Sequence, residues 1–165
     1  MAIKVCGNIV LPNINGVSGN NVSIGTYSGL GNNITGVNNI AIGAGALQNN
    51  TYGCSNIAQG YQALNKNTIG VNNVAMGYQA LCCNTTGSGN IAIGYQALLC
   101  NTTGGNNTAI GCFALRSNTT GVSNIAVGYG ALYCNTTGSN NIAIGYNTLY
   151  QNRSGCNNTA MGCFA

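Results

Sequence analysis

The sequence contains no aspartate, no glutamate, no histidine and no tryptophan, and only one proline among 165 residues. Carboxylates and imidazoles are the usual general acids and bases of enzymes, and they also supply most ligands for calcium, magnesium and zinc. Their absence argues against an enzyme. We therefore expect no catalytic residue, no cofactor and no metal site.

Positive charge is also scarce, since the only basic residues are Lys4, Lys66, Arg116 and Arg153. Recognition of nucleic acid needs a clustered basic face, which four scattered cations do not form. Glycine and polar residues interrupt every apolar stretch, so we expect no insertion into a membrane. The first twelve residues lack the long apolar run of a secretory signal, so we expect no signal peptide. Disorder is disfavoured because 45% of the residues are hydrophobic.

A 17-residue repeat fills most of the chain. Glycine recurs at this step from Gly43 to Gly162, and leucine from Leu30 to Leu149. In the unit 84–100, N-T-T-G-S-G-N-I-A-I-G-Y-Q-A-L-L-C, the alternating run N-I-A-I-G predicts a short strand. Y-Q-A-L predicts a second short extended piece, and N-T-T-G predicts a turn. The unit is too short for a helix pair. It predicts one coil of an all-β fold, a parallel β-solenoid or β-roll.

The repeat divides the chain into two parts. Residues 19–165 form about eight coils, and residues 1–18 lie outside the repeat. The β-prone runs 2–5 and 8–11 indicate that this leader caps a coil or is donated as a strand to the next subunit. The repeat stops at Ala165, where we expect an open strand edge that favours further pairing.

Each column of the repeat becomes a ladder when the coils stack about 4.8 Å apart. Stacked asparagine amides can hydrogen-bond along the axis. The invariant alanines lie opposite the large apolar residues of the strand, and this small surface suggests close approach by the other wall of the coil or by another chain. The structural ladders include Asn90, Asn107, Asn124, Asn141, Ala92, Ala109, Ala126, Gly94, Gly111 and Gly128.

Nine cysteines are present, and several share a column. Cys83 and Cys100 lie in neighbouring coils, at a spacing of about 4.8 Å that suits a disulfide, with Cys82 as a competitor. The odd total leaves at least one thiol free or paired to another chain. The alternative is that these cysteines are small buried apolar residues. The candidates for disulfides or interchain thiols are Cys6, Cys82, Cys83, Cys100, Cys134 and Cys163.

An aromatic column follows the strand glycine. It comprises Tyr61, Tyr78, Tyr95, Tyr129 and Tyr146. Such a column can bind a carbohydrate or another partner, or it can pack along the coil with its hydroxyls in water.

The unit N-x-A-I-G, as in 90–94 and 141–145, resembles the head repeats of trimeric autotransporter adhesins, the YadA-like heads. Similar repeats are found in viral and phage fibre proteins. The resemblance covers roughly residues 20–165. It implies a left-handed parallel β-roll that trimerises side by side and binds host surfaces. The unit here is longer than in that family and richer in cysteine.

Together these features predict a structural protein that self-assembles into a homo-oligomeric filament, outside the cell or on a cell or virion surface. Its partner is a second copy of itself, in a homotrimer or a head-to-tail filament. The alternative is an adhesin head that binds a cell-surface receptor or glycan. A third reading is an ice-binding solenoid, because Thr85, Thr102, Thr119 and Thr136 form a regular column.

Overall fold

The computed structural model describes residues 3–5, 8–10, 19–29 and 35–165. Within them the chain forms an antiparallel hairpin and a nine-stranded parallel sheet, and no helix. The hairpin pairs β1 (Ile3–Val5) with β2 (Asn8–Val10). The sheet contains β3 (Val22–Ile24), β4 (Ile40–Ile42), β5 (Ile57–Gln59), β6 (Val74–Met76), β7 (Ile91–Ile93), β8 (Thr108–Ile110), β9 (Ile125–Val127), β10 (Ile142–Ile144) and β11 (Thr159–Met161). The prediction of an all-β parallel solenoid is confirmed.

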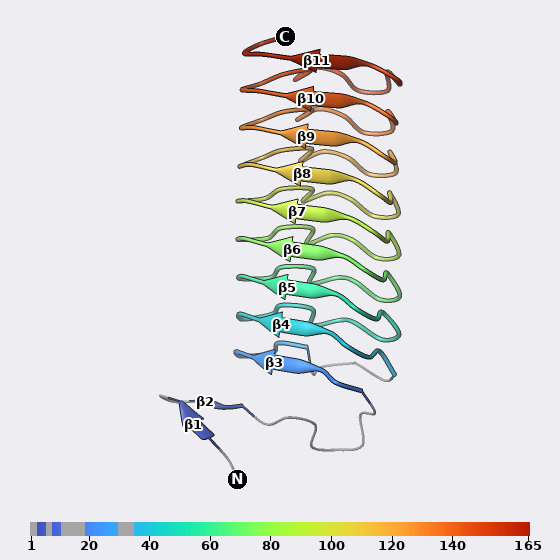
Figure 1. Cartoon of the computed structure of the whole chain (residues 1–165). Helices are drawn as coiled ribbons and strands as arrows, with labels where there is room; N and C mark the ends of the chain where they lie inside the picture. Colours follow the sequence, from blue (N-terminus) through green and yellow to red (C-terminus); the bar gives the residue numbers. More distant parts are fainter. Residues whose placement is uncertain (1–2, 6–7, 11–18, 30–34) are drawn as a thin grey trace.

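The coils stack in strict register along one axis. Ala58 pairs with Ala75, and Ala75 pairs with Ala92, so equivalent residues of successive coils lie side by side. The first coil has one additional residue, because Val22 pairs with Ile40. In Figure 1 the near strands run from right to left while the chain climbs and returns behind them. The coil is therefore left-handed.

The leader contains strands at both β-prone runs, β1 and β2, which form a sheet of their own. The hairpin lies near the end of the stack that begins with β3 (Figure 1). Its role as a cap or a donated strand stays a prediction.

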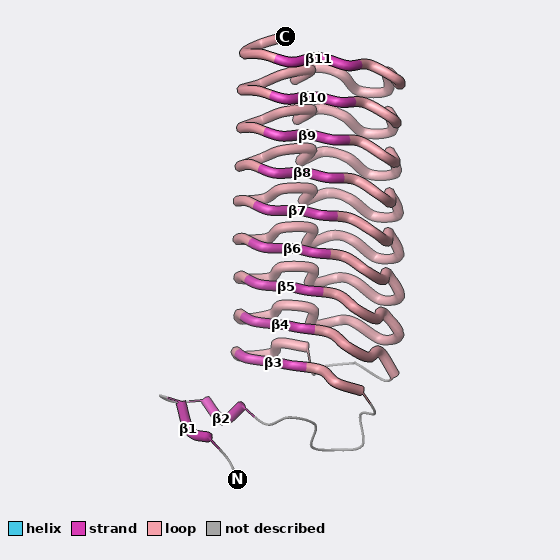
Figure 2. The backbone as a smooth tube through the Cα atoms, in the orientation of Figure 1, coloured by secondary structure: helices cyan, strands magenta, loops and turns pink. Residues whose placement is uncertain are grey.

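Within the described residues each coil contains one strand, and the predicted second extended piece is wrong. Figure 2 shows strand on one side of each coil and turns elsewhere. In the Y-Q-A-L segment Gln79 and Leu81 adopt left-handed conformations, with φ of 52° and 53°. Gln79 N–H consequently donates to Tyr61 O of the preceding coil at 2.8 Å, whereas Leu81 N–H donates to Ala97 O of the following coil at 2.9 Å. This wall is a stack of turns that are hydrogen-bonded in both axial directions.

The interior is a thin layer of alanine and leucine. Ala92 of the strand, and Ala97 and Leu98 of the turn wall, are all fully buried in one continuous core cluster. The small face of the strand is therefore packed against the other wall of the same coil, and not against another chain. Ile91 and Ile93, the large neighbours of Ala92, point outward and each keep 37% of their surface exposed.

Two columns of asparagine amides complete the interior. Asn90 donates its main-chain N–H to Asn73 Oδ1 at 3.0 Å, and its Nδ2 to the same oxygen at 3.1 Å and to Gly104 O at 2.9 Å. In the second column, Asn84 Nδ2 donates to Asn67 Oδ1 at 2.8 Å. These side chains are fully buried. Their hydrogen bonds satisfy buried polar groups that would otherwise cost stability, so the ladders serve the fold.

Candidate functional surfaces

The outward residues of the strands form two parallel columns, which we call the outer sheet face. The first column contains Val22, Ile40, Ile57, Val74, Ile91, Thr108, Ile125, Ile142 and Thr159, and the second contains Ile24, Ile42, Gln59, Met76, Ile93, Ile110, Val127, Ile144 and Met161. All of them are exposed or half-buried, and none carries a charge. Because polar side chains usually cover exposed sheet faces, so large an aliphatic surface marks a candidate contact site.

The tyrosine column lies just beyond the strand end. Tyr78 stacks on Tyr61 with ring centroids 5.2 Å apart, and on Tyr95 with centroids 5.1 Å apart at an interplanar angle of 8°. Tyr129 and Tyr146 stack in the same way at 5.2 Å. Each ring therefore turns its faces toward the neighbouring coils and its edge and hydroxyl toward solvent. A sugar that stacks on an aromatic face would find these faces largely covered by other rings.

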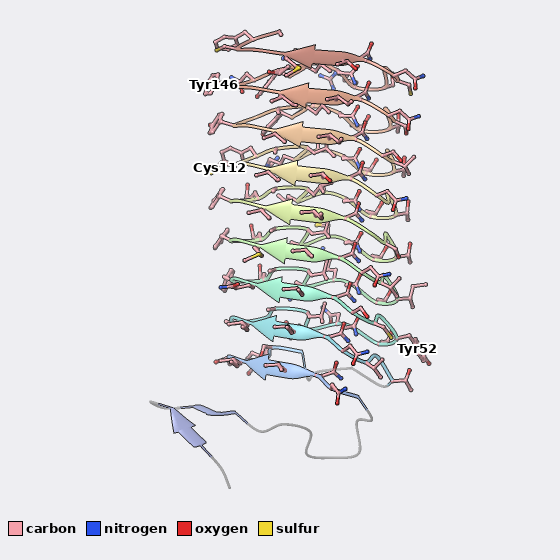
Figure 3. All side chains as sticks on the ribbon, in the orientation of Figure 1. Tyr52, Cys112 and Tyr146 are labelled. Carbon is pink, nitrogen blue, oxygen red and sulfur yellow. The ribbon has the colours of Figure 1, made fainter. Side chains whose placement is uncertain are left out.

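In one coil the aromatic ring comes from the residue that follows the tyrosine position. Cys112 stands where other coils have tyrosine, and it lies at the same edge of the stack as Tyr146 (Figure 3). Phe113 places its ring edge-on between Tyr95, at 5.3 Å, and Tyr129, at 5.7 Å. The aromatic column, defined as Tyr61, Tyr78, Tyr95, Phe113, Tyr129, Tyr146 and Phe164, is therefore continuous. The sequence contains the signal, since phenylalanine follows cysteine at both 112–113 and 163–164.

Three thiols gather on the turn wall. Cys83 interacts electrostatically with Cys82 of its own coil and with Cys100 of the next coil. Burial, followed by the nearby Cys83, raises the pKa of the Cys82 thiol to about 11, although Lys66 opposes the shift. Burial and Cys83 also raise the pKa of Cys100, and Arg116 opposes this. The structure thus brings together the proposed pair, Cys83 and Cys100, and the competitor Cys82.

The remaining cysteines are dispersed. Cys134 is half-buried in the same column as Cys100, and Cys163 is exposed at the last coil. All eight cysteines among the described residues are free thiols, so their pairing stays a prediction. Cys6 lies outside the described residues.

The threonine column uses its hydroxyls within the fold. Thr85 Oγ1 donates to Thr102 O of the next coil at 3.0 Å, and Thr102 Oγ1 donates to Thr119 O at 3.1 Å. Thr119 repeats the contact with Thr136 O at 3.0 Å. A hydroxyl that donates to a carbonyl has no proton left for an external surface, and this argues against a row of threonines that binds ice.

Two features were not foreseen from the sequence: the outward orientation of the large strand residues, and a glutamine ladder in which Gln96 Nε2 donates to Gln79 Oε1 at 3.0 Å. Among the described residues no group of histidine, cysteine or carboxylate side chains could hold a metal ion. The same part of the chain contains no helix that could span a membrane. No family model, no curated protein and no solved structure matches the chain.

Proposed function

We propose that this chain is a structural protein that self-assembles into a homo-oligomeric surface or extracellular fibre, within which copies pack side by side through the outer sheet face. The observation that carries this proposal is the continuous, uncharged and largely aliphatic face over nine strands, in which Gln59, Thr108 and Thr159 are the polar positions. Isolated exposed hydrophobic residues are common, but a contiguous apolar patch is typical of a contact surface.

The size of the surface supports the proposal. Nine strands spaced about 4.8 Å apart extend for about 38 Å, and the outer sheet face together with the aromatic column is about 14 Å wide. The resulting area of roughly 500 Å² lies at the upper end of the apolar patches found on monomers. Two copies would together bury about 1,000 Å², which is near the lower limit for a specific interface.

The periodicity of the surface favours a second copy as the partner. Side chains that recur every 4.8 Å or so form ridges and grooves that interlock along their whole length only with a surface of the same period. Another copy of this chain has that period. The uncharged face gives an unrelated receptor no electrostatic feature to recognise.

The two alternatives have less support. An adhesin head that recognises glycans needs accessible ring faces, and the tyrosine rings cover one another. An ice-binding surface needs an ordered row of free hydroxyls, and the regular threonines donate to main-chain carbonyls.

The test compares two variants that each add two lysines, two coils apart. Ile110→Lys with Ile144→Lys charges the outer sheet face, where both residues are exposed. Thr103→Lys with Thr137→Lys adds the same charge to an exposed turn column. Size-exclusion chromatography with light scattering and negative-stain microscopy would follow assembly, and circular dichroism would verify folding.

We expect the wild type and the threonine variant to assemble, whereas the isoleucine variant stays monomeric and folded. A monomeric wild type, or a folded isoleucine variant that assembles like the wild type, would overturn the proposal.

A further inference from the structure

Seven of the nine tyrosines form stacks between neighbouring coils. Tyr61, Tyr78 and Tyr95 make one set, and Tyr129 and Tyr146 make a second. The third set is Tyr133 and Tyr150, whose ring centroids lie 4.9 Å apart at an interplanar angle of 8°. The other two tyrosines, Tyr27 and Tyr52, are exposed and have no ring contact within the described residues.

We propose that these stacks are sites of oxidative cross-linking, at which a dityrosine bond joins consecutive coils of one chain. The oxidant is hydrogen peroxide, and the catalyst is a haem peroxidase. This modification concerns contacts within one chain, so it holds whether or not the chain self-assembles.

The coupling is a two-electron oxidation of two phenols by hydrogen peroxide. The peroxidase removes one electron and one proton from each of two phenols, and hydrogen peroxide takes up both electrons and both protons to give two waters. The two phenoxyl radicals then form a carbon–carbon bond between their ortho carbons. Each of those carbons loses its hydrogen to a phenolic oxygen, which restores aromaticity. The net change in the protein is the loss of two hydrogen atoms for each new bond.

The geometry favours coupling within a set. Register holds the Cβ atoms of stacked tyrosines about 4.8 Å apart, so small rotations of two rings can bring their ortho carbons together. Tyr61, Tyr78 and Tyr95 keep 47%, 43% and 43% of their surface exposed, so an oxidant can reach the phenols. Phe113 cannot form a phenoxyl radical, and it separates the first set from the second.

The consequence is mechanical. Hydrogen bonds and side-chain packing are the only contacts seen between coils of the described part, and a dityrosine bond would add a covalent link along the axis. Such a link closes a loop of one coil, which restricts the unfolded chain in the same way as a disulfide. Local unfolding of the cross-linked coils would then become rarer.

The experiment begins with alkylation of the thiols, because thiols reduce phenoxyl radicals. Dilute protein is treated with hydrogen peroxide and a peroxidase, and denaturing electrophoresis then separates single chains from cross-linked dimers. Dityrosine fluorescence and intact mass are measured on the single-chain band. We expect fluorescence in that band and the loss of two hydrogen atoms for each bond.

Two variants with matched chemistry locate the reaction. The triple variant combines Tyr78→Phe, Tyr146→Phe and Tyr150→Phe. It keeps every stacked ring but leaves no phenol stacked on another phenol in any of the three sets. Tyr27→Phe with Tyr52→Phe removes the isolated phenols. We expect the triple variant to lose the single-chain signal and the double variant to keep all of it. Dityrosine found only in dimers, or an undiminished single-chain signal in the triple variant, would overturn the proposal.

Discussion

The ring of Phe113 meets the ring of Tyr95 edge-on, with centroids 5.3 Å apart and an interplanar angle of 85°. It makes a similar contact with Tyr129 on its other side. Phe164 repeats the arrangement against Tyr146 three coils later, at 5.3 Å and 75°. A cysteine in the tyrosine position is thus accompanied both times by a phenylalanine that restores the aromatic column.

This compensation predicts that Phe113→Gln destabilises the chain by about 1.5–4.5 kcal/mol, because its edge-to-face contacts with Tyr95, Tyr129 and Tyr133, of about 0.5–1.5 kcal/mol each, are lost. Urea unfolding followed by circular dichroism measures the change. Adding Cys112→Tyr to this variant recreates the Tyr-Gln pair of positions 61–62 and should recover most of the loss. If the double variant is no more stable than Phe113→Gln alone, the two positions are not coupled.

The buried asparagine column gives a second prediction. Asn107 Oδ1 accepts from Asn124 N at 3.0 Å and from Asn124 Nδ2 at 3.1 Å, while its own Nδ2 donates to Gly121 O at 2.9 Å. Asn107→Ala leaves several buried groups without these partners, at about 1–3 kcal/mol each. We expect a loss of at least about 3 kcal/mol in the free energy of unfolding.

The neighbouring Asn106 provides the control. It is exposed and left-handed, with φ of 57°, in a column where Gly89 occurs naturally. Asn106→Gly should change the free energy of unfolding by less than about 1 kcal/mol. Equal effects of the two substitutions would show that the buried ladder contributes no special stability.

The sequence predicts the period, the strand and the ladders because an exact repeat forces equivalent residues into register. It does not reveal which face of the strand is inside. Ala92 lies between Ile91 and Ile93, and the usual preference for large apolar residues in a core would bury the isoleucines. In the structure Ala92 and Leu98 are instead fully buried in the same core cluster, so the strand turns its alanine toward the turn wall and its isoleucines outward.

The second wall could not be derived from propensity either. Leucine and glutamine rarely adopt positive φ, so Leu81 and Gln79 suggest an extended segment rather than turns. The one hint is that Gly45 and Gly130 share a column with Gln79, and glycine favours that conformation. Stacking of the coils supplies the hydrogen bonds that stabilise the strained residues.

The close contact between the glycines that follow successive strands gives a third prediction. Gly94 has φ of +134°, and a Cβ there would lie 2.6 Å from Gly111 O of the next coil. Gly94→Ala should therefore lower the free energy of unfolding by several kcal/mol, on the order of 3. Gly105→Ser is the control, because Gly105 has no positive φ, its added Cβ would lie 3.0 Å from Ser88 O, and Ser88 and Ser139 occupy the same column. It should lower the free energy of unfolding by less than about 1 kcal/mol. Comparable losses in the two variants would contradict the steric explanation.

The thiol cluster gives the last prediction, that a mild oxidant joins Cys83 to Cys100. Equivalent positions in neighbouring coils suit a disulfide, and closing a loop of this length contributes about 3 kcal/mol. Cys82 is a weak competitor, because burial raises its pKa to about 11 and leaves about one thiolate in a thousand at pH 8. Raising the pH toward 11 should increase its share of the product.

Peptide mapping under non-reducing conditions identifies the bond, and urea unfolding with and without reductant measures its stabilising effect. Cys82→Ser should keep the bond and the added stability, whereas Cys83→Ser should lose both. A bond that joins Cys82 to Cys83 at pH 8, or a Cys83→Ser variant that still gains stability on oxidation, would show that the axial pairing is wrong. Since thiolate is the attacking species, the reaction should slow at lower pH.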